Sequence, residues 1–96
     1  MKEETILRLI GKGETETVEF KSAFDQAAIE TLAAFANAKG GYVLVGVANS
    51  GKIVGVQLGA ETIPQWLNQI KANTSPSLIP DVATIIRNQK DIVILR

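Results

Sequence analysis

The chain has 96 residues, with ten Lys and Arg balanced by ten Asp and Glu, and it contains neither cysteine nor histidine. Disulfides, thiolate metal sites, Ser-His-Asp triads and histidine-based zinc sites are therefore excluded. The hydrophobic content of 46% is typical of a globular chain, and the length suits one small domain. No apolar stretch approaches the ~20 residues of a membrane span, and the N-terminus lacks the pattern of a signal peptide, so we expect a cytoplasmic protein.

The N-terminal part predicts a helix, a strand and a second helix. A short amphipathic helix is expected around residues 6–10, packed across one edge of the fold. The alternation over 15–20 predicts a half-exposed strand whose glutamates point to solvent. We expect the next helix to begin at Ser22, which forms a variant of the capping box with Asp25, and to end near Lys39.

The C-terminal part predicts four strands and one helix. The apolar run over 41–47 indicates a central strand covered on both faces, and 52–56 repeats its character, which predicts an antiparallel hairpin. An amphipathic helix is expected over 60–71. Two more strands are expected over 82–86 and 91–95.

These elements predict a single compact α+β domain over residues 1–96, in the order α-β-α-β-β-α-β-β. The expected sheet is mixed or antiparallel, with two to three helices packed on it. Because the last predicted strand runs into Arg96 without a terminating turn, we expect the sequence to be a piece of a longer protein.

Residues 46–52 match the first seven positions of the phosphate-binding loop G-x-x-x-x-G-K-[ST]. Position 53 is Ile, however, so the hydroxyl that would hold Mg²⁺ is missing, and the following segment is predicted to be extended rather than helical. We interpret the segment as a turn that needs Gly51 for its backbone, and we expect no nucleotide cofactor.

Three acidic residues, Glu14, Glu16 and Glu19, cluster before and within the first predicted strand. Carboxylates coordinate Mg²⁺ or Mn²⁺, and such ions support phosphodiester cleavage. A site of this kind normally needs carboxylates from different elements, and Asp25 and Asp81 are the other candidates. The alternative is an acidic strand edge that faces solvent and discourages aggregation.

Three lysines, Lys21, Lys39 and Lys52, each stand at the end of a predicted element beside a loop of small or polar residues, such as Asn49 and Ser50. Flexible ammonium groups and exposed backbone N–H groups are the usual contacts to phosphate oxygens. If the elements end on one edge, the lysines form a patch. The alternative is that they are ordinary solubilising charges.

Four blocks carry a family resemblance: residues 14–22, 34–41, 45–47 and 51–56. In this order and spacing they resemble the Schlafen-related, AlbA-like family of DNA-binding domains, once classified as a divergent AAA module. The resemblance is clear from Glu14 to about Ile70 and continues weakly to the end.

The resemblance implies a compact α+β domain at the N-terminus of prokaryotic proteins such as transcriptional regulators. In Schlafen-type relatives, two glutamates flanking the Glu-Phe-Lys strand and a third acid later in the domain cleave RNA. Glu14 and Glu19 match the first two. Many members carry an acid after the Gly-Val of the hairpin, whereas this chain has Ala48 and Asn49 there, which counts against a third metal ligand.

We therefore expect a nucleic-acid-binding module of a transcriptional regulator, with DNA as its partner, no catalytic activity in isolation, and no metal or cofactor. The expected contacts are Lys21, Lys39, Lys52, Asn49 and Ser50. Two alternatives remain: a ribonuclease that uses Glu14 and Glu19 with Mg²⁺ or Mn²⁺, and a protein-interaction domain with a pairing strand edge. Because zero net charge predicts weak binding by one copy, we also expect a homodimer, as well as downstream domains of the same protein and no membrane partner.

Overall fold

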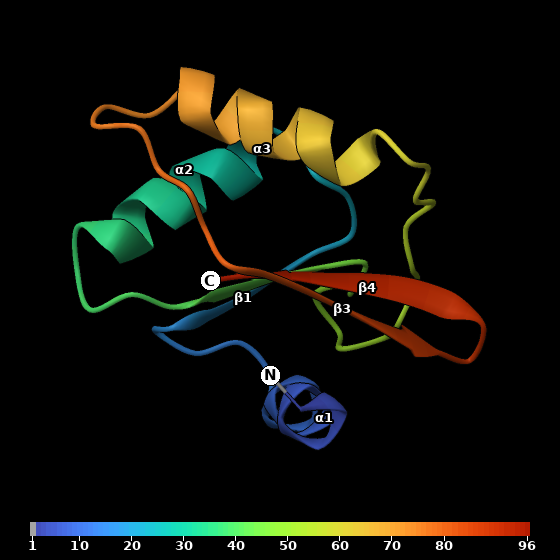
Figure 1. Cartoon of the computed structure of the whole chain (residues 1–96). Helices are drawn as coiled ribbons and strands as arrows, with labels where there is room; N and C mark the ends of the chain where they lie inside the picture. Colours follow the sequence, from blue (N-terminus) through green and yellow to red (C-terminus); the bar gives the residue numbers. More distant parts are fainter. Residues whose placement is uncertain (1) are drawn as a thin grey trace.

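One mixed sheet and three helices form the part of the chain that the computed structural model describes, residues 2–96. The elements are α1 (Glu3–Lys12), β1 (Val18–Lys21), α2 (Gln26–Ala36), β2 (Tyr42–Val45), α3 (Thr62–Ala72), β3 (Val82–Arg87) and β4 (Lys90–Leu95). The strand order is β1-β2-β4-β3, with β1 parallel to β2 and the other neighbours antiparallel (Figure 1). The predicted α+β class is confirmed, and the observed elements follow the predicted order without its fifth element, the strand over 52–56. None of the helices within 2–96 is long and apolar enough to cross a membrane.

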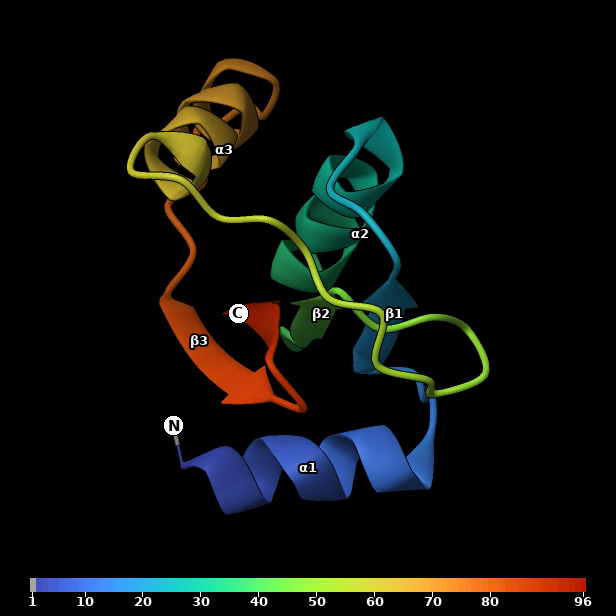
Figure 2. The same ribbon diagram turned by 90° about the vertical axis from the view of Figure 1, so that its right-hand side faces the viewer.

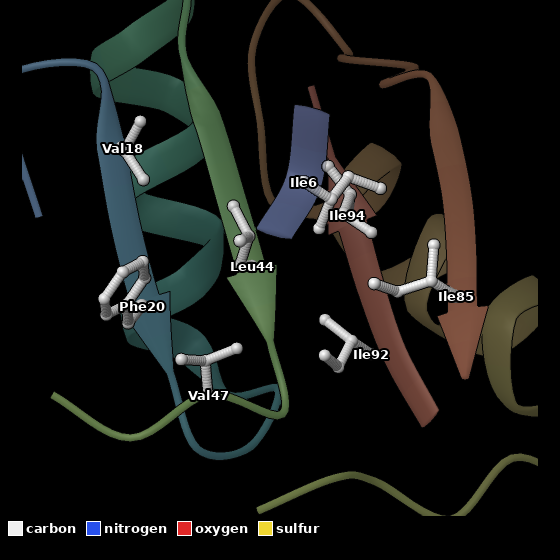
Figure 3. Close-up of a cluster of buried hydrophobic side chains, with 8 residues drawn as sticks. All are labelled: Ile6, Val18, Phe20, Leu44, Val47, Ile85, Ile92 and Ile94. Atoms are coloured by element: carbon white, nitrogen blue, oxygen red, sulfur yellow. The ribbon is translucent and has the colours of Figure 1, made fainter. Parts of the chain in front are cut away.

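The helices cover both faces of the sheet. Helices α2 and α3 lie on one face and α1 lies on the other (Figures 1 and 2). The expectation that the first helix packs across an edge was therefore wrong. Its apolar stripe is seated under the sheet, where Ile6 is fully buried beside Ile94 (Figure 3). The physical reason is that this face carries buried apolar side chains, which the helix shields from water.

The central strands β2 and β4 are buried on both faces, as the apolar run over 41–47 predicts. Val43 and Val45 belong to the cluster under α2 and α3, whereas Leu44 belongs to the cluster above α1. The same alternation occurs in β4, because successive side chains in a strand point to opposite faces. The sheet thus separates two apolar layers. Packing in both layers holds β1 and β2 in place, and the candidate site lies at the C-terminal ends of these strands.

Helix α2 begins later than the expected start at Ser22. Its N-cap is Asp25, whose carboxylate accepts a hydrogen bond from the Ala28 N–H at 3.1 Å. The preceding residues form the connection from β1 to the helical layer, and Phe24 in this connection stacks on Trp66 of α3 with ring centroids 4.7 Å apart. The helix ends at Ala36 rather than near Lys39.

Residues 52–56 form isolated bridges in place of a full strand. Ile53 pairs with Val47, and Val56 pairs with Asp91. Gly46 ends β2 with a φ of 105°, and its carbonyl accepts the N–H groups of residues 54 and 55 at 2.9 and 2.8 Å. This positive φ turns the chain out of the strand, so the predicted hairpin is reduced to a tight loop at the end of the sheet.

Candidate nucleic-acid interface

The C-terminal ends of β1 and β2 lie at the same end of the sheet, because the two strands are parallel. Lys21 is the last residue of β1, and its carbonyl accepts hydrogen bonds from Gly46 and Val47 at 2.7 and 3.2 Å. These bonds join β1 to the loop that follows β2. Lys21 therefore lies at the same end as the loop over residues 46–52.

This loop presents short polar side chains and a lysine to solvent. The Ala48 carbonyl accepts the Gly51 N–H at 2.8 Å, and the Ala48 N–H donates to the Lys52 carbonyl at 2.8 Å. The hydroxyl of Ser50 accepts the Lys52 N–H at 3.3 Å. Asn49, Ser50 and Lys52 are exposed. The next helix begins only at Thr62, so the loop does not lead into a helix as a phosphate-binding loop would.

A residue that the sequence analysis missed, Lys12, belongs to the same end of the molecule. It lies in the last turn of α1, and a Cβ placed on Gly51 would be 3.7 Å from the carbonyl oxygen of Ile10 in that turn. Figure 2 shows this end of α1 and the loop after β2 on the same side of the molecule. The only signal in the sequence was a lysine at the end of an amphipathic helix, which does not show where that helix docks.

Lys39 lies at the opposite end of the sheet. It precedes β2, and the Tyr42 N–H at the start of this strand donates to the carbonyl of Thr17, just before β1. Lys39 shares a surface hollow with Thr17, Tyr42, Asp81 and Arg96. The patch of three lysines is therefore not formed. In a parallel pair, a residue before one strand and a residue after its neighbour lie at opposite ends.

Glu14, which precedes β1, and Glu19, which lies within β1, are in contact. The Glu14 side chain accepts the backbone N–H of Phe20 at 3.0 Å and shares a hydrogen bond with the Glu19 side chain. The bond to Glu19 and the Phe20 N–H lower the pKa of Glu14. The same bond, followed by desolvation, raises the pKa of Glu19, so Glu19 is the member of the pair that keeps its proton to higher pH and donates it to Glu14.

The other acidic residues are placed elsewhere. Glu16 is exposed in the turn before β1, Asp25 caps α2, and Asp81 lies near Lys39. Within residues 2–96, no group of three or more His, Cys, Asp or Glu side chains is placed to hold a metal ion. Two of the carboxylates at this end, Glu14 and Glu19, contact each other, whereas Asp91, near the start of β4, does not join them in a group that could hold a metal ion. The positive charge of Lys21 lies near enough to favour the ionised form of both glutamates.

Comparison with known proteins gives a family and a fold. The sequence profile of the family described as Schlafen, AlbA_2 matches residues 14–96, which confirms the resemblance found in the sequence. A crystal structure of the DIP2311 protein from Corynebacterium diphtheriae is similar in fold, with a TM-score of 0.68 and 18% sequence identity. The match covers 96% of this chain and 24% of that one, so this chain spans about a quarter of the length of that protein. No curated protein matches the chain.

Proposed function

The chain belongs to the Schlafen AlbA_2 family, and this membership indicates a nucleic-acid-related domain. On that premise we propose that the chain is a non-catalytic DNA-binding module of a larger transcriptional regulator. The observation that carries the proposal is the shared end of β1 and β2. There, Lys21 is joined through its carbonyl to the loop that exposes Asn49, Ser50 and Lys52.

The chemistry at this end suits contacts to the phosphate backbone. Lysine is a flexible point charge, and short hydroxyl and amide side chains donate hydrogen bonds to phosphate oxygens. Lys12, in the last turn of α1, and Lys90, at the start of β4, add further cations to the same end. Glu14 and Glu19 partly offset this charge, so we expect weak binding that depends strongly on salt concentration.

The test is a fluorescence anisotropy titration of labelled single- and double-stranded DNA and RNA at low and moderate salt. Lys21→Ala and Lys52→Ala are each expected to weaken binding to all sequences alike and to reduce the salt slope by about one. Lys39→Ala is the matched control, because it removes the same charge at the opposite end of the sheet. A flat titration with every nucleic acid at low salt would rule the proposal out.

A second candidate function, a metal-dependent ribonuclease, is favoured by the contact between Glu14 and Glu19. Two adjacent carboxylates can share one Mg²⁺ or Mn²⁺, with the remaining positions filled by water and substrate phosphate oxygens. Such an ion would stabilise the developing charge on the phosphate and the leaving oxygen. The family resemblance leads us to expect an acid after Gly46 and Val47, where this chain has Ala48 and Asn49, so the contacting donor set has two carboxylates.

Incubation of labelled RNA with the chain and Mn²⁺, followed by gel electrophoresis, separates the two candidates. Intact RNA together with salt-sensitive binding supports the binding module. RNA cleavage that is lost in both Glu14→Gln and Glu19→Gln, but kept in the exposed control Glu16→Gln, would replace it with the nuclease. Cleavage that survives in both variants would point to a contaminating enzyme.

A further inference from the structure

Strand β3 is the outermost strand of the sheet, and one of its two edges is open. Just before β3, Asp81 exchanges two backbone hydrogen bonds with Arg96, of 3.0 and 3.2 Å. Because the bonding alternates along an antiparallel pair, the odd-numbered residues of β3 bond to β4 and the even-numbered ones point their N–H and carbonyl groups outward. The outward groups belong to Val82, Thr84 and Ile86. Within residues 2–96, no hydrogen bond uses them.

The opposite edge of the sheet, on β1, is closed. The N–H and carbonyl of Val18 both bond to Thr15, at 3.4 and 3.0 Å. The outward N–H of Phe20 is occupied by the Glu14 carboxylate. A second molecule therefore meets a free backbone ladder at β3 and a mostly occupied one at β1, so we expect that pairing through β3 does not continue from β1.

The side chains of β3 do not protect its edge. Free edges are usually guarded by charged residues or proline within the strand, whereas β3 has the sequence Val-Ala-Thr-Ile-Ile-Arg. Ile86 is 68% exposed, one of the few large hydrophobic side chains left in solvent. Charges stand only at the two ends, Asp81 before the strand and Arg87 as its last residue.

We propose that two copies of this chain pair antiparallel through β3, about a two-fold axis at Thr84, and so join their sheets into one. In this register Thr84 faces Thr84 of the second copy, and Val82 faces Ile86 of the second copy. All the outward N–H and carbonyl groups of the three residues are then bonded. Ile86 is covered by an apolar neighbour, and Asp81 of each copy faces Arg87 of the other.

Other registers satisfy fewer groups. A shift by one residue sets outward groups against residues that already bond to β4. A shift by two leaves outward groups unpaired and separates Asp81 from Arg87 of the second copy. The two-fold register is thus favoured both by the parity of the hydrogen bonds and by charge complementarity, and a two-fold interface closes at a dimer.

The layers on the two faces are compatible with this pairing. Figure 2 shows β3 at the border of the sheet, between α3 on one face and α1 on the other. Val82 packs against the cluster under α2 and α3, and Ile85 belongs to the cluster above α1. The paired strand from the second copy would therefore extend both apolar layers across the axis.

Sedimentation velocity over a wide concentration range, without nucleic acid, tests the inference independently of the proposed function. The wild-type chain is expected to dimerise. Thr84→Pro removes an outward N–H that β4 does not use, so it should give a folded monomer, as proline is tolerated at such edge positions. Thr84→Val keeps the N–H and should keep the dimer. Circular dichroism checks the fold of each variant.

A charge exchange tests the register. Asp81→Arg and Arg87→Asp each place two like-charged pairs across the axis, so each should raise the dissociation constant of the dimer about tenfold. The double variant, with both charges exchanged, should restore it. A wild-type chain that stays monomeric, a dimer that Thr84→Pro leaves intact, or a double variant no better than the single ones would overturn the proposal. Open-ended assembly would also contradict it.

Discussion

The carboxylate of Glu14 accepts the backbone N–H of Phe20 at 3.0 Å, across six positions of the sequence. The Phe20 side chain is buried beneath the sheet, while its N–H faces the outer edge of β1. Glu14 thus covers a donor that would otherwise be open to strand pairing, and its second contact holds the carboxyl of Glu19. The Glu14 side chain therefore both covers the open N–H at the edge of β1 and forms the acidic pair with Glu19.

Replacement of Glu14 tests its structural role. Glu14→Ala should lower the free energy of unfolding by about 1 kcal/mol, because the bond to the Phe20 N–H is lost at a partly buried position. Glu16→Ala removes the same charge from an exposed turn residue and should change stability by less than about 0.5 kcal/mol. Urea denaturation at neutral pH measures both. Equal effects would mean that charge, and not the hydrogen bond, is responsible.

The acidic pair of Glu14 and Glu19 makes the stability of the domain depend on pH, and Glu19→Gln should remove part of this dependence. Because the pKa of Glu19 is raised above its ordinary value of 4.5, its contribution to stability is present below that value and is lost as the pH rises through the raised pKa. The lowered pKa of Glu14 acts in the opposite sense, with stability present above 4.5 and lost as the pH falls through the lowered pKa.

Glu19→Gln supplies a permanent donor to Glu14, so the bond no longer depends on the proton of Glu19. The variant should gain stability relative to wild type between about pH 4.5 and neutrality, by about 0.5 kcal/mol or less at this solvent-screened site. Denaturation curves across this range give the difference, with Glu16→Gln as the control for the loss of one charge. A difference that stays flat with pH would contradict a bond that depends on this proton.

The observed start of α2 can be tested with two small changes. Asp25→Ala should cost about 1 kcal/mol of stability, because it removes the side chain that accepts the Ala28 N–H. Ser22→Ala should be nearly neutral, since Ser22 is exposed and lies before the cap. Thermal denaturation of both variants is sufficient. A larger loss for Ser22→Ala would restore the cap that the sequence suggested.

Gly41 allows α2 and the start of β2 to pack closely, because it has no side chain. A Cβ at this position would lie 2.6 Å from the ring of Phe35 and 2.8 Å from the carbonyl oxygen of Thr17. Gly41→Ala should therefore destabilise the domain by about 1–3 kcal/mol. Gly11→Ala is the matched control. Gly11 lies inside α1 with open space around it, so alanine should stabilise the helix by about 0.5 kcal/mol.

Local patterns in the sequence were sufficient for most of the fold. The apolar run around Leu44 identified the buried strand β2, and the spacing around Ile70 identified α3, because both depend on how side chains alternate or recur along the chain. The loop with Asn49 and Ser50 was likewise evident from its turn residues. The exception was the strand expected over 52–56, which has a positive φ at Gly55 and forms only isolated bridges.

The sequence by itself determined the α+β class, the family, and the residues that end β1 and follow β2, because these depend on neighbours along the chain. Only the tertiary structure decided that Lys39 and Lys21 lie at opposite ends of the sheet, that Lys12 lies at the same end as Lys21, and that the Glu14 side chain reaches the Phe20 N–H. Each of these depends on strand direction, helix docking and sheet order, which arise from packing between segments distant in the chain. The same sheet order decided that β3, and not β1, presents the open edge.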